Sequence, residues 1–178
     1  MSIMTSRQNE NITIFMIGDS TMANKPYLDG NPEKGWGQVF GLYFRDEVKV
    51  DNHAVNGRSS KSFINEGRWQ KVRELIKPGD YVIIQFGHND QKKNSPERYA
   101  PPQTEYRQNL EKFIHETRDL GANPVLATPI VRRRFDEYAH FYDTHGAYPD
   151  VVREVARELD VPLLDLHKKS RELLITDF

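Results

Sequence analysis

Two short apolar runs of this sequence each lead into a polar loop that carries groups able to do hydrolytic chemistry. Residues 12–17 lead into Gly-Asp-Ser-Thr-Met, and residues 81–86 lead into Gly-His-Asn-Asp. A serine directly after a buried strand exposes its hydroxyl, and its own backbone N–H can stabilise an oxyanion. Ser20 is therefore the candidate nucleophile, and the side-chain amide of Asn89 is a candidate oxyanion donor.

A third candidate lies in residues 52–60, Asn-His-Ala-Val-Asn-Gly-Arg-Ser-Ser. Gly57 has no Cβ, so its N–H could approach a bound acyl group closely. Each of the three motifs also has a non-functional interpretation: Gly-Asp-Ser can occur by chance, Asn-Gly is a common turn pair, and Gly-His-Asn-Asp could cap a helix. Their order, and their predicted place at one edge of a sheet, favour a common site.

The elements that would position these residues follow from hydrophobic patterning. The nearly continuous apolar runs at 12–17 and 81–86 are typical of central parallel strands covered on both faces. Residues 47–51 alternate apolar and charged side chains, as an edge strand would. Residues 124–128 and 161–165 are two further candidate strands.

Between these strands, apolar residues recur at helical spacing and predict three amphipathic helices. The stripes are Trp69, Val72, Leu75 and Ile76; Tyr106, Leu110, Phe113, Ile114 and Thr117; and Val151, Val152, Val155, Ala156 and Leu159. Alternating strands and helices predict an α/β fold, a three-layer α/β/α sandwich with right-handed crossovers. If the alternating strand lies at an edge, the sheet has the flavodoxin-like order 2-1-3-4-5. In such a sheet, ligands bind at the carboxyl ends of strands 1 and 3, where the strand order reverses.

Length and composition bound the function. The chain has 178 residues, 25 Lys+Arg against 26 Asp+Glu, a net charge of −1 and no cysteine. We expect one domain over residues 1–178, without a disulfide, a thiolate zinc site or a cysteine nucleophile. Balanced charge argues against a nucleic-acid partner. No apolar run could span a bilayer, and residues 1–10 lack the apolar core of a secretory signal, so a soluble, cytoplasmic protein without a membrane partner is expected.

Metal and cofactor motifs are missing from the sequence. There is no His-Glu-x-x-His, and neither His140 nor His145 has an evident ligand partner. The rival class of this architecture, a nucleotide- or flavin-binding domain, needs a glycine-rich phosphate cradle after strand 1. Residues 30–35 have the two glycines of a P-loop but continue Trp-Gly and follow no predicted strand. We therefore predict neither a metal nor a cofactor.

Taken in order, these blocks resemble the SGNH or GDSL hydrolases, and within them the rhamnogalacturonan acetylesterase-like branch. The matching segments are 17–22, 35–37, 54–63, 86–90, 128–129, 132–135, 144–149 and 165–167. The resemblance implies Ser20 as nucleophile, with an oxyanion hole of the Ser20 N–H, the Gly57 N–H and the Asn89 side chain. It also implies metal-independent deacetylation of a carbohydrate ester through an acyl-enzyme.

The sequence departs from this family at the general base, a histidine three residues after an aspartate near the C-terminus. No Asp-x-x-His occurs, and the chain stops at Phe178. A serine hydroxyl is a weak nucleophile without a base. Three explanations stay open: a C-terminally truncated chain, a non-catalytic carbohydrate-binding or scaffold protein, or another histidine such as His53, His88, His145 or one from a neighbouring subunit. We interpret 165–167, Asp-Leu-His, as a structural strand end.

The expected partner is an acetylated carbohydrate. Residues 132–134, three arginines, could meet carboxylates of an acidic polysaccharide, and Trp36, Tyr27 and Tyr142 could stack on sugar rings. Trp69 lies on a helical core stripe and is expected to be structural. A shortened sheet would expose apolar surface and so favour a homo-oligomer.

Overall fold

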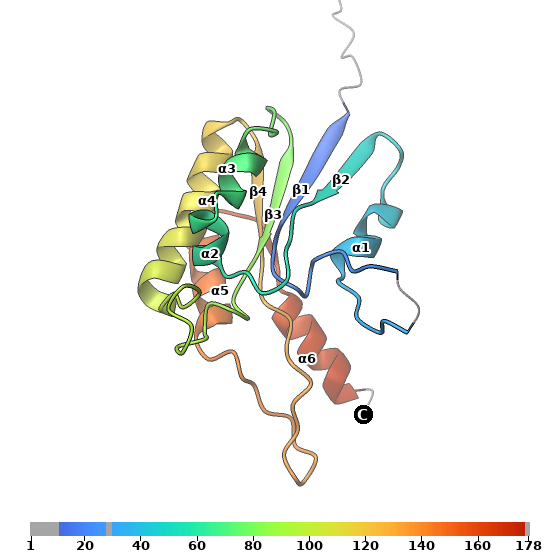
Figure 1. The fold of residues 1–178 in the computed structure, drawn as a ribbon, viewed down its shortest axis with the longest axis vertical. Helices are drawn as coiled ribbons and strands as arrows, with labels where there is room; N and C mark the ends of the chain where they lie inside the picture. The colour runs from blue at the N-terminus through green and yellow to red at the C-terminus, as the bar shows by residue number, and fades with distance from the viewer. Residues whose placement is uncertain (1–10, 28–29, 177–178) are drawn as a thin grey trace, which may run out of the picture.

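The computed structural model describes residues 11–27 and 30–176, so the expectations about residues 1–10 and about the chain end at Phe178 fall outside the described residues. The described strands form one parallel sheet in the order β2-β1-β3-β4-β5, which confirms the predicted α/β class and strand order. The strands are β1 (Ile12–Gly18), β2 (Val48–Asn52), β3 (Tyr81–Gln85), β4 (Asn123–Ala127) and β5 (Leu163–Leu164). Their carboxyl ends share one edge of the sheet (Figure 1).

The hydrophobic pattern of the strands agrees with their positions in the sheet. The continuous apolar run of β1 is buried and pairs with β2 on one side and β3 on the other. The alternating strand β2 is at an edge, as expected. The last strand is shorter than the predicted 161–165, because the Val161 N–H still bonds the Ala156 carbonyl at the end of the preceding helix, at 2.8 Å.

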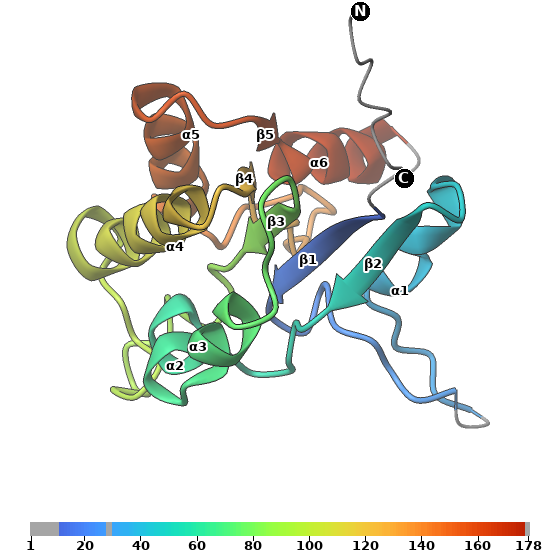
Figure 2. The ribbon, with the colours of Figure 1, turned by 90° about the horizontal axis from the view of Figure 1, so that it is seen from above.

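Helices cover the two faces unequally (Figure 2). One face carries α2 (Ser60–Asn65), α3 (Arg68–Arg73), α4 (Arg107–Asp119) and α5 (Tyr148–Glu158), and the other carries α1 (Gly37–Phe40) and α6 (Leu166–Thr176). Short turns of helix, η1 (Gly41–Tyr43) and η2 (Pro102–Tyr106), follow α1 and precede α4. The second of these shows that the predicted stripe beginning at Tyr106 starts in a distorted turn.

Leu75 was predicted on the buried face of the first helical stripe, and this prediction is wrong. Helix α3 ends at Arg73, the Leu75 N–H turns back to the Val72 carbonyl at 3.0 Å, and the Leu75 side chain is 50% exposed. The tightened turn rotates this leucine away from the sheet, whereas Trp69 and Val72 stay buried.

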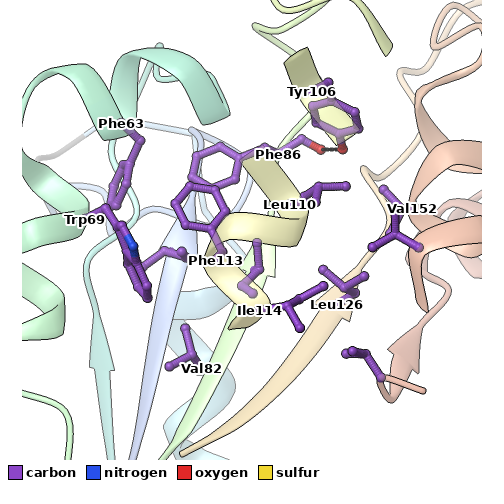
Figure 3. Packing of buried hydrophobic residues seen from close by; sticks show 14 of the residues in the cluster. Phe63, Trp69, Val82, Phe86, Tyr106, Leu110, Phe113, Ile114, Leu126 and Val152 are labelled. Carbon is purple, nitrogen blue, oxygen red and sulfur yellow. Dashed lines mark hydrogen bonds between the residues drawn. The ribbon is translucent and has the colours of Figure 1, made fainter. Parts of the chain in front are cut away.

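The larger core lies under α2 to α5 and combines aromatic rings with aliphatic side chains (Figure 3). Phe86 stacks on Phe113 with ring centroids 5.5 Å apart, and Trp69 meets Phe113 edge-on at 5.1 Å. The Tyr106 hydroxyl donates to the Phe86 carbonyl at 3.0 Å. Trp69 is 2% exposed, which confirms that it is a core residue. This packing fixes the end of β3, from which the loop with Asn89 departs.

The opposite face of the sheet is less completely covered. A groove of about 320 Å³ is lined only by apolar and aromatic residues, among them Ile12, Phe44, Tyr81 and Leu164. The oligomeric state that such a surface would favour stays a prediction. None of the described helices is both long enough and apolar enough to cross a membrane.

Candidate functional site

Ser20 lies in a tight loop at the end of β1, and Asp19 holds this loop in shape. The fully buried Asp19 carboxylate accepts hydrogen bonds from the Thr21 N–H at 2.9 Å and from the Thr21 hydroxyl at 2.8 Å. Ser20 itself is half-buried. Within the described residues, neither its hydroxyl nor its backbone N–H makes a hydrogen bond. Both groups are therefore free to meet a substrate.

Asp19 stays charged despite its burial. Desolvation by burial raises the pKa of this carboxyl, but the contact with His88 and its charge, together with the hydrogen bonds from Thr21, outweigh it and lower the pKa below the usual value. The His88 Nδ1 atom lies 3.5 Å from Asp19 Oδ2. These contacts hold the loop that carries Ser20.

The Gly-Trp-Gly motif at 35–37 supports the same loop from outside. The Trp36 N–H bonds the Thr21 carbonyl at 3.0 Å, and the Trp36 indole N–H donates to Gln85 at 2.9 Å. A Cβ on Gly35 would lie 2.0 Å from the Ala23 carbonyl oxygen, so only glycine allows this close approach. Gly35 thus serves packing against the Ser20 loop.

Gly57 lies in the loop after β2 with a positive φ of 75°, a conformation that glycine adopts without strain. The neighbouring Val55 N–H bonds the Gly18 carbonyl at 3.0 Å, which ties this loop to the end of β1. Nothing comes closer than 3.9 Å to a Cβ built on Gly57, and its N–H is unbonded among the described residues. The position therefore leaves an open backbone donor.

Asn89 and Asp90 connect the loop after β3 to the loop after β2. The buried Asn89 amide donates to the Arg58 carbonyl at 3.0 Å. Asp90 accepts from the Ser60 N–H and from the Gly87 N–H, each at 2.9 Å. Burial raises the pKa of Asp90 to about 7. Hydrogen bonds thus join the three loops that carry Ser20, Gly57 and Asn89.

The histidines considered as bases do not hydrogen-bond to Ser20 within the described residues. His88 faces Asp19, and its Nε2 atom lies 3.4 Å from Nε2 of His145. His53 lies 3.2 Å from Asp51 on the outer strand β2. Burial, with smaller contributions from the charges of His88 and Arg132, lowers the pKa of His145 to about 4. His145 is therefore neutral at pH 7.

The structure brings together two residues that the sequence analysis did not place in the site, Asp143 and His167. Asp143 Oδ2 lies 2.7 Å from Nε2 of His167, and its Oδ1 lies 3.4 Å from Nδ1 of His145. His167 lies in the first turn of α6, not at the end of an edge strand as predicted. The pair Asp-x-His at 143–145 was the available signal, but its partner is 22 residues further along the chain.

Arg132, one of the predicted sugar contacts, is better explained as structural. The Arg132 guanidinium donates to the His88 carbonyl at 3.1 Å and to the Thr144 hydroxyl at 3.0 Å, so it ties the loop before α5 to the site. Asp165 forms a two-point pair with Arg153, with both distances 3.0 Å, and is structural as predicted. Tyr27 and Tyr142 remain exposed, at 80% and 48%.

Comparison with known proteins identifies the relatives of this chain. The model of the GDSL-like lipase/acylhydrolase family matches residues 16–176. The chain is 46% identical over 162 residues to the rhamnogalacturonan acetylesterase RhgT of Bacillus subtilis, covering 91% of this chain and 68% of that protein. It is 41% identical over 157 residues to the probable rhamnogalacturonan acetylesterase YesY of the same organism, covering 88% and 71%.

Solved structures share the fold. The Bacillus subtilis protein YxiM superposes with a TM-score of 0.80 at 28% identity over 93% of this chain, which spans only 47% of that one. An acetyl xylan esterase variant of Geobacillus stearothermophilus gives a TM-score of 0.66 at 21% identity, over 93% and 81% of the two chains, and so shows the shared fold alone. With a family match over most of its length and relatives at 46% and 41% identity, the chain belongs to the GDSL-like lipase/acylhydrolase family.

Proposed function

We propose that this protein is a serine esterase that removes acetyl groups from a carbohydrate, with Ser20 as the nucleophile. The observation that supports this best is the unbonded hydroxyl and N–H of Ser20 at the end of β1, in a loop tied to the open N–H donor of Gly57. The names of the relatives supply the substrate class, acetylated rhamnogalacturonan.

In the proposed reaction, Ser20 Oγ attacks the acetyl carbonyl carbon and its proton passes to a base. The carbonyl oxygen becomes an oxyanion that accepts hydrogen bonds from the N–H groups of Ser20 and Gly57 and from the Asn89 amide. The sugar hydroxyl leaves with a proton, and water then releases acetate from the acetylated serine. One Asn89 amide proton is held by the Arg58 carbonyl, which orients the side chain and leaves the second for the oxyanion.

A second candidate function is binding of acetylated sugar without turnover. It is favoured by one observation: within the described residues, no histidine is hydrogen-bonded to Ser20. The two functions differ in what Ser20 does, so they can be separated by experiment.

The test is acetate release from an aryl acetate and from acetylated rhamnogalacturonan, over a series of protein concentrations. The chain is compared with Ser20→Ala and with the control Ser95→Ala, which removes a serine hydroxyl that bonds Glu97 in another loop. A parallel series contains imidazole, an external base that can replace a missing histidine.

Release that Ser20→Ala abolishes and Ser95→Ala keeps would support the esterase. A rate per chain that rises with concentration would indicate a base across a subunit interface. Ser20-dependent release only with imidazole would mean that the nucleophile and oxyanion hole work and that a base must be supplied. Binding of the acetylated polysaccharide without any Ser20-dependent release would favour the non-catalytic function.

A further inference from the structure

Next to the candidate site, three side chains from two distant segments converge on one point. Asp143 and His145 come from the long segment between β4 and α5, which extends beyond the carboxyl ends of the strands (Figure 1), and His167 comes from α6. One carboxylate oxygen and one ring nitrogen from each histidine all lie within 4.8 Å of one another. This is the spacing of atoms that can share a single cation.

Two buried imidazole nitrogens face the Asp143 carboxylate at this point. His145 and His167 are 1% and 7% exposed, and within the described residues neither His145 Nδ1 nor His167 Nε2 has a hydrogen-bond partner. The His167 nitrogen lies 2.7 Å from Asp143 Oδ2. Buried polar atoms without hydrogen-bond partners are energetically unfavourable. An ion bound where these atoms converge would give each of them a partner.

The surroundings suit metal-bound histidines. A ligand histidine usually donates its other ring N–H to a neighbouring group. His145 Nε2 lies 3.4 Å from His88 Nε2, and His88 Nδ1 lies 3.5 Å from Asp19. With Nδ1 of His145 on a cation, its Nε2 proton faces His88, and the His88 proton faces the Asp19 carboxylate. Each ring nitrogen of His145 and His88 then either binds the cation, donates a proton or accepts one.

One contact must adjust. Arg153 Nη2 lies 3.4 Å from Nδ1 of His167, and binding through Nε2 would place the ring proton on that Nδ1. The same guanidinium is held by Asp165 through two bonds of 3.0 Å. We expect the long contact to open and the bidentate pair to remain.

We propose that Asp143, His145 and His167 bind a divalent transition-metal ion, with Zn²⁺ as the preferred class. The two imidazoles favour zinc over calcium or magnesium, a carboxylate oxygen is also a common zinc ligand, and water would complete four-coordination. Asp143 is 36% exposed, so an ion could enter from its side. The bound ion would link the segment before α5 to α6, beside His88.

The test adds Zn²⁺ to the full, untagged chain. Binding calorimetry, and metal analysis after dialysis, should show that one ion binds per chain. Four-coordinate Co²⁺ should give visible absorption as an independent readout. Asp143→Asn and His167→Gln should weaken binding by more than about tenfold. The matched control is His140→Gln, which removes an exposed histidine 3.2 Å from Asp136 in the same segment.

A ligand that binds only the folded state also stabilises it, so zinc at about a hundredfold excess over Kd should raise Tm by about 5–10 °C in the wild type and His140→Gln. The partly exposed Asp143→Asn variant keeps the test open if His167→Gln fails to fold. The proposal is overturned if folded wild type binds no stoichiometric zinc, if Asp143→Asn binds as tightly as wild type, or if His140→Gln alone loses binding.

Discussion

Two largely buried polar clusters lie at the same edge of the sheet and differ in their hydrogen bonding. In the Asp90 cluster, made of Asp90, Ser60 and Gly87, both carboxylate oxygens accept backbone N–H groups at 2.9 Å. In the histidine cluster, made of Asp19, His88, His145, Asp143 and His167, Asp19 Oδ2 and three ring nitrogens lack hydrogen-bond partners among the described residues. The first cluster is saturated and the second is not.

This difference distinguishes polar groups that stabilise the fold from polar groups that are available for function. A buried polar group with all its partners fixes the backbone, because breaking any of its bonds leaves the others unpaired. Asp90 thereby holds the loop of Asn89 against α2. The ring nitrogens of the histidine cluster instead face the carboxylates of Asp19 and Asp143 at 2.7–3.5 Å without such hydrogen bonds, an arrangement that suits a ligand or proton transfer. In both clusters burial favours the neutral form: it raises the pKa of Asp90 to about 7 and lowers that of His145 to about 4.

The largest expected effect is on stability. Asp90→Ala leaves two backbone N–H groups and the Ser60 hydroxyl unpaired, and should lower the free energy of unfolding by roughly 3–6 kcal/mol. Asp143→Ala, at a partly exposed carboxylate, should cost only about 1 kcal/mol. Denaturant unfolding of both variants measures the difference, and equal losses would contradict the contrast between the clusters.

The Asp90 cluster should also give a pH dependence of stability. Because the folded pKa of about 7 lies above the unfolded value, the stabilising contribution is full below about pH 4 and is lost as pH rises to 7, by roughly 4 kcal/mol. Asp90→Asn does not titrate. Unfolding free energies measured from pH 4 to 8 should therefore show the wild type losing its advantage relative to this variant, and parallel curves would argue against a neutral Asp90.

Asn89 lies between the clusters in sequence and should matter for rate. Asn89→Ala removes one proposed oxyanion donor and should lower Ser20-dependent turnover by about 10²–10³, with or without imidazole. Circular dichroism checks that the fold is kept. An unchanged rate would rule out Asn89 as an oxyanion donor.

The smallest effect concerns Gly57. Its positive φ makes Gly57→Ala strained, at about 1–2 kcal/mol in unfolding free energy, although the space beside it is open. Gly67→Ala is a matched control, since Gly67 has a φ of 68° and also has open space. Both should lose similar stability, but only Gly57→Ala should also lose turnover. Equal activity in the two would leave Gly57 with a turn role alone.

The sequence by itself determined the sheet and the loops of the candidate site. Continuous apolar runs mark β1 and β3 as central strands, alternation marks β2 as an edge, and parallel strands bring their carboxyl ends to one edge. From these local patterns, the convergence of the loops that carry Ser20, Gly57 and Asn89 could be predicted. Their catalytic roles remain proposals.

Only the tertiary structure decided how the remaining polar residues are used. Asp143, His145 and His167 meet because the segment before α5 folds back onto α6, and no periodicity records a contact between loops. The sequence pattern likewise does not show that Arg132 donates to the His88 carbonyl. Nor does it show that a tightened turn exposes Leu75. Hydrophobic spacing fixes which elements form and in what order, whereas the pairing of buried polar groups depends on three-dimensional packing.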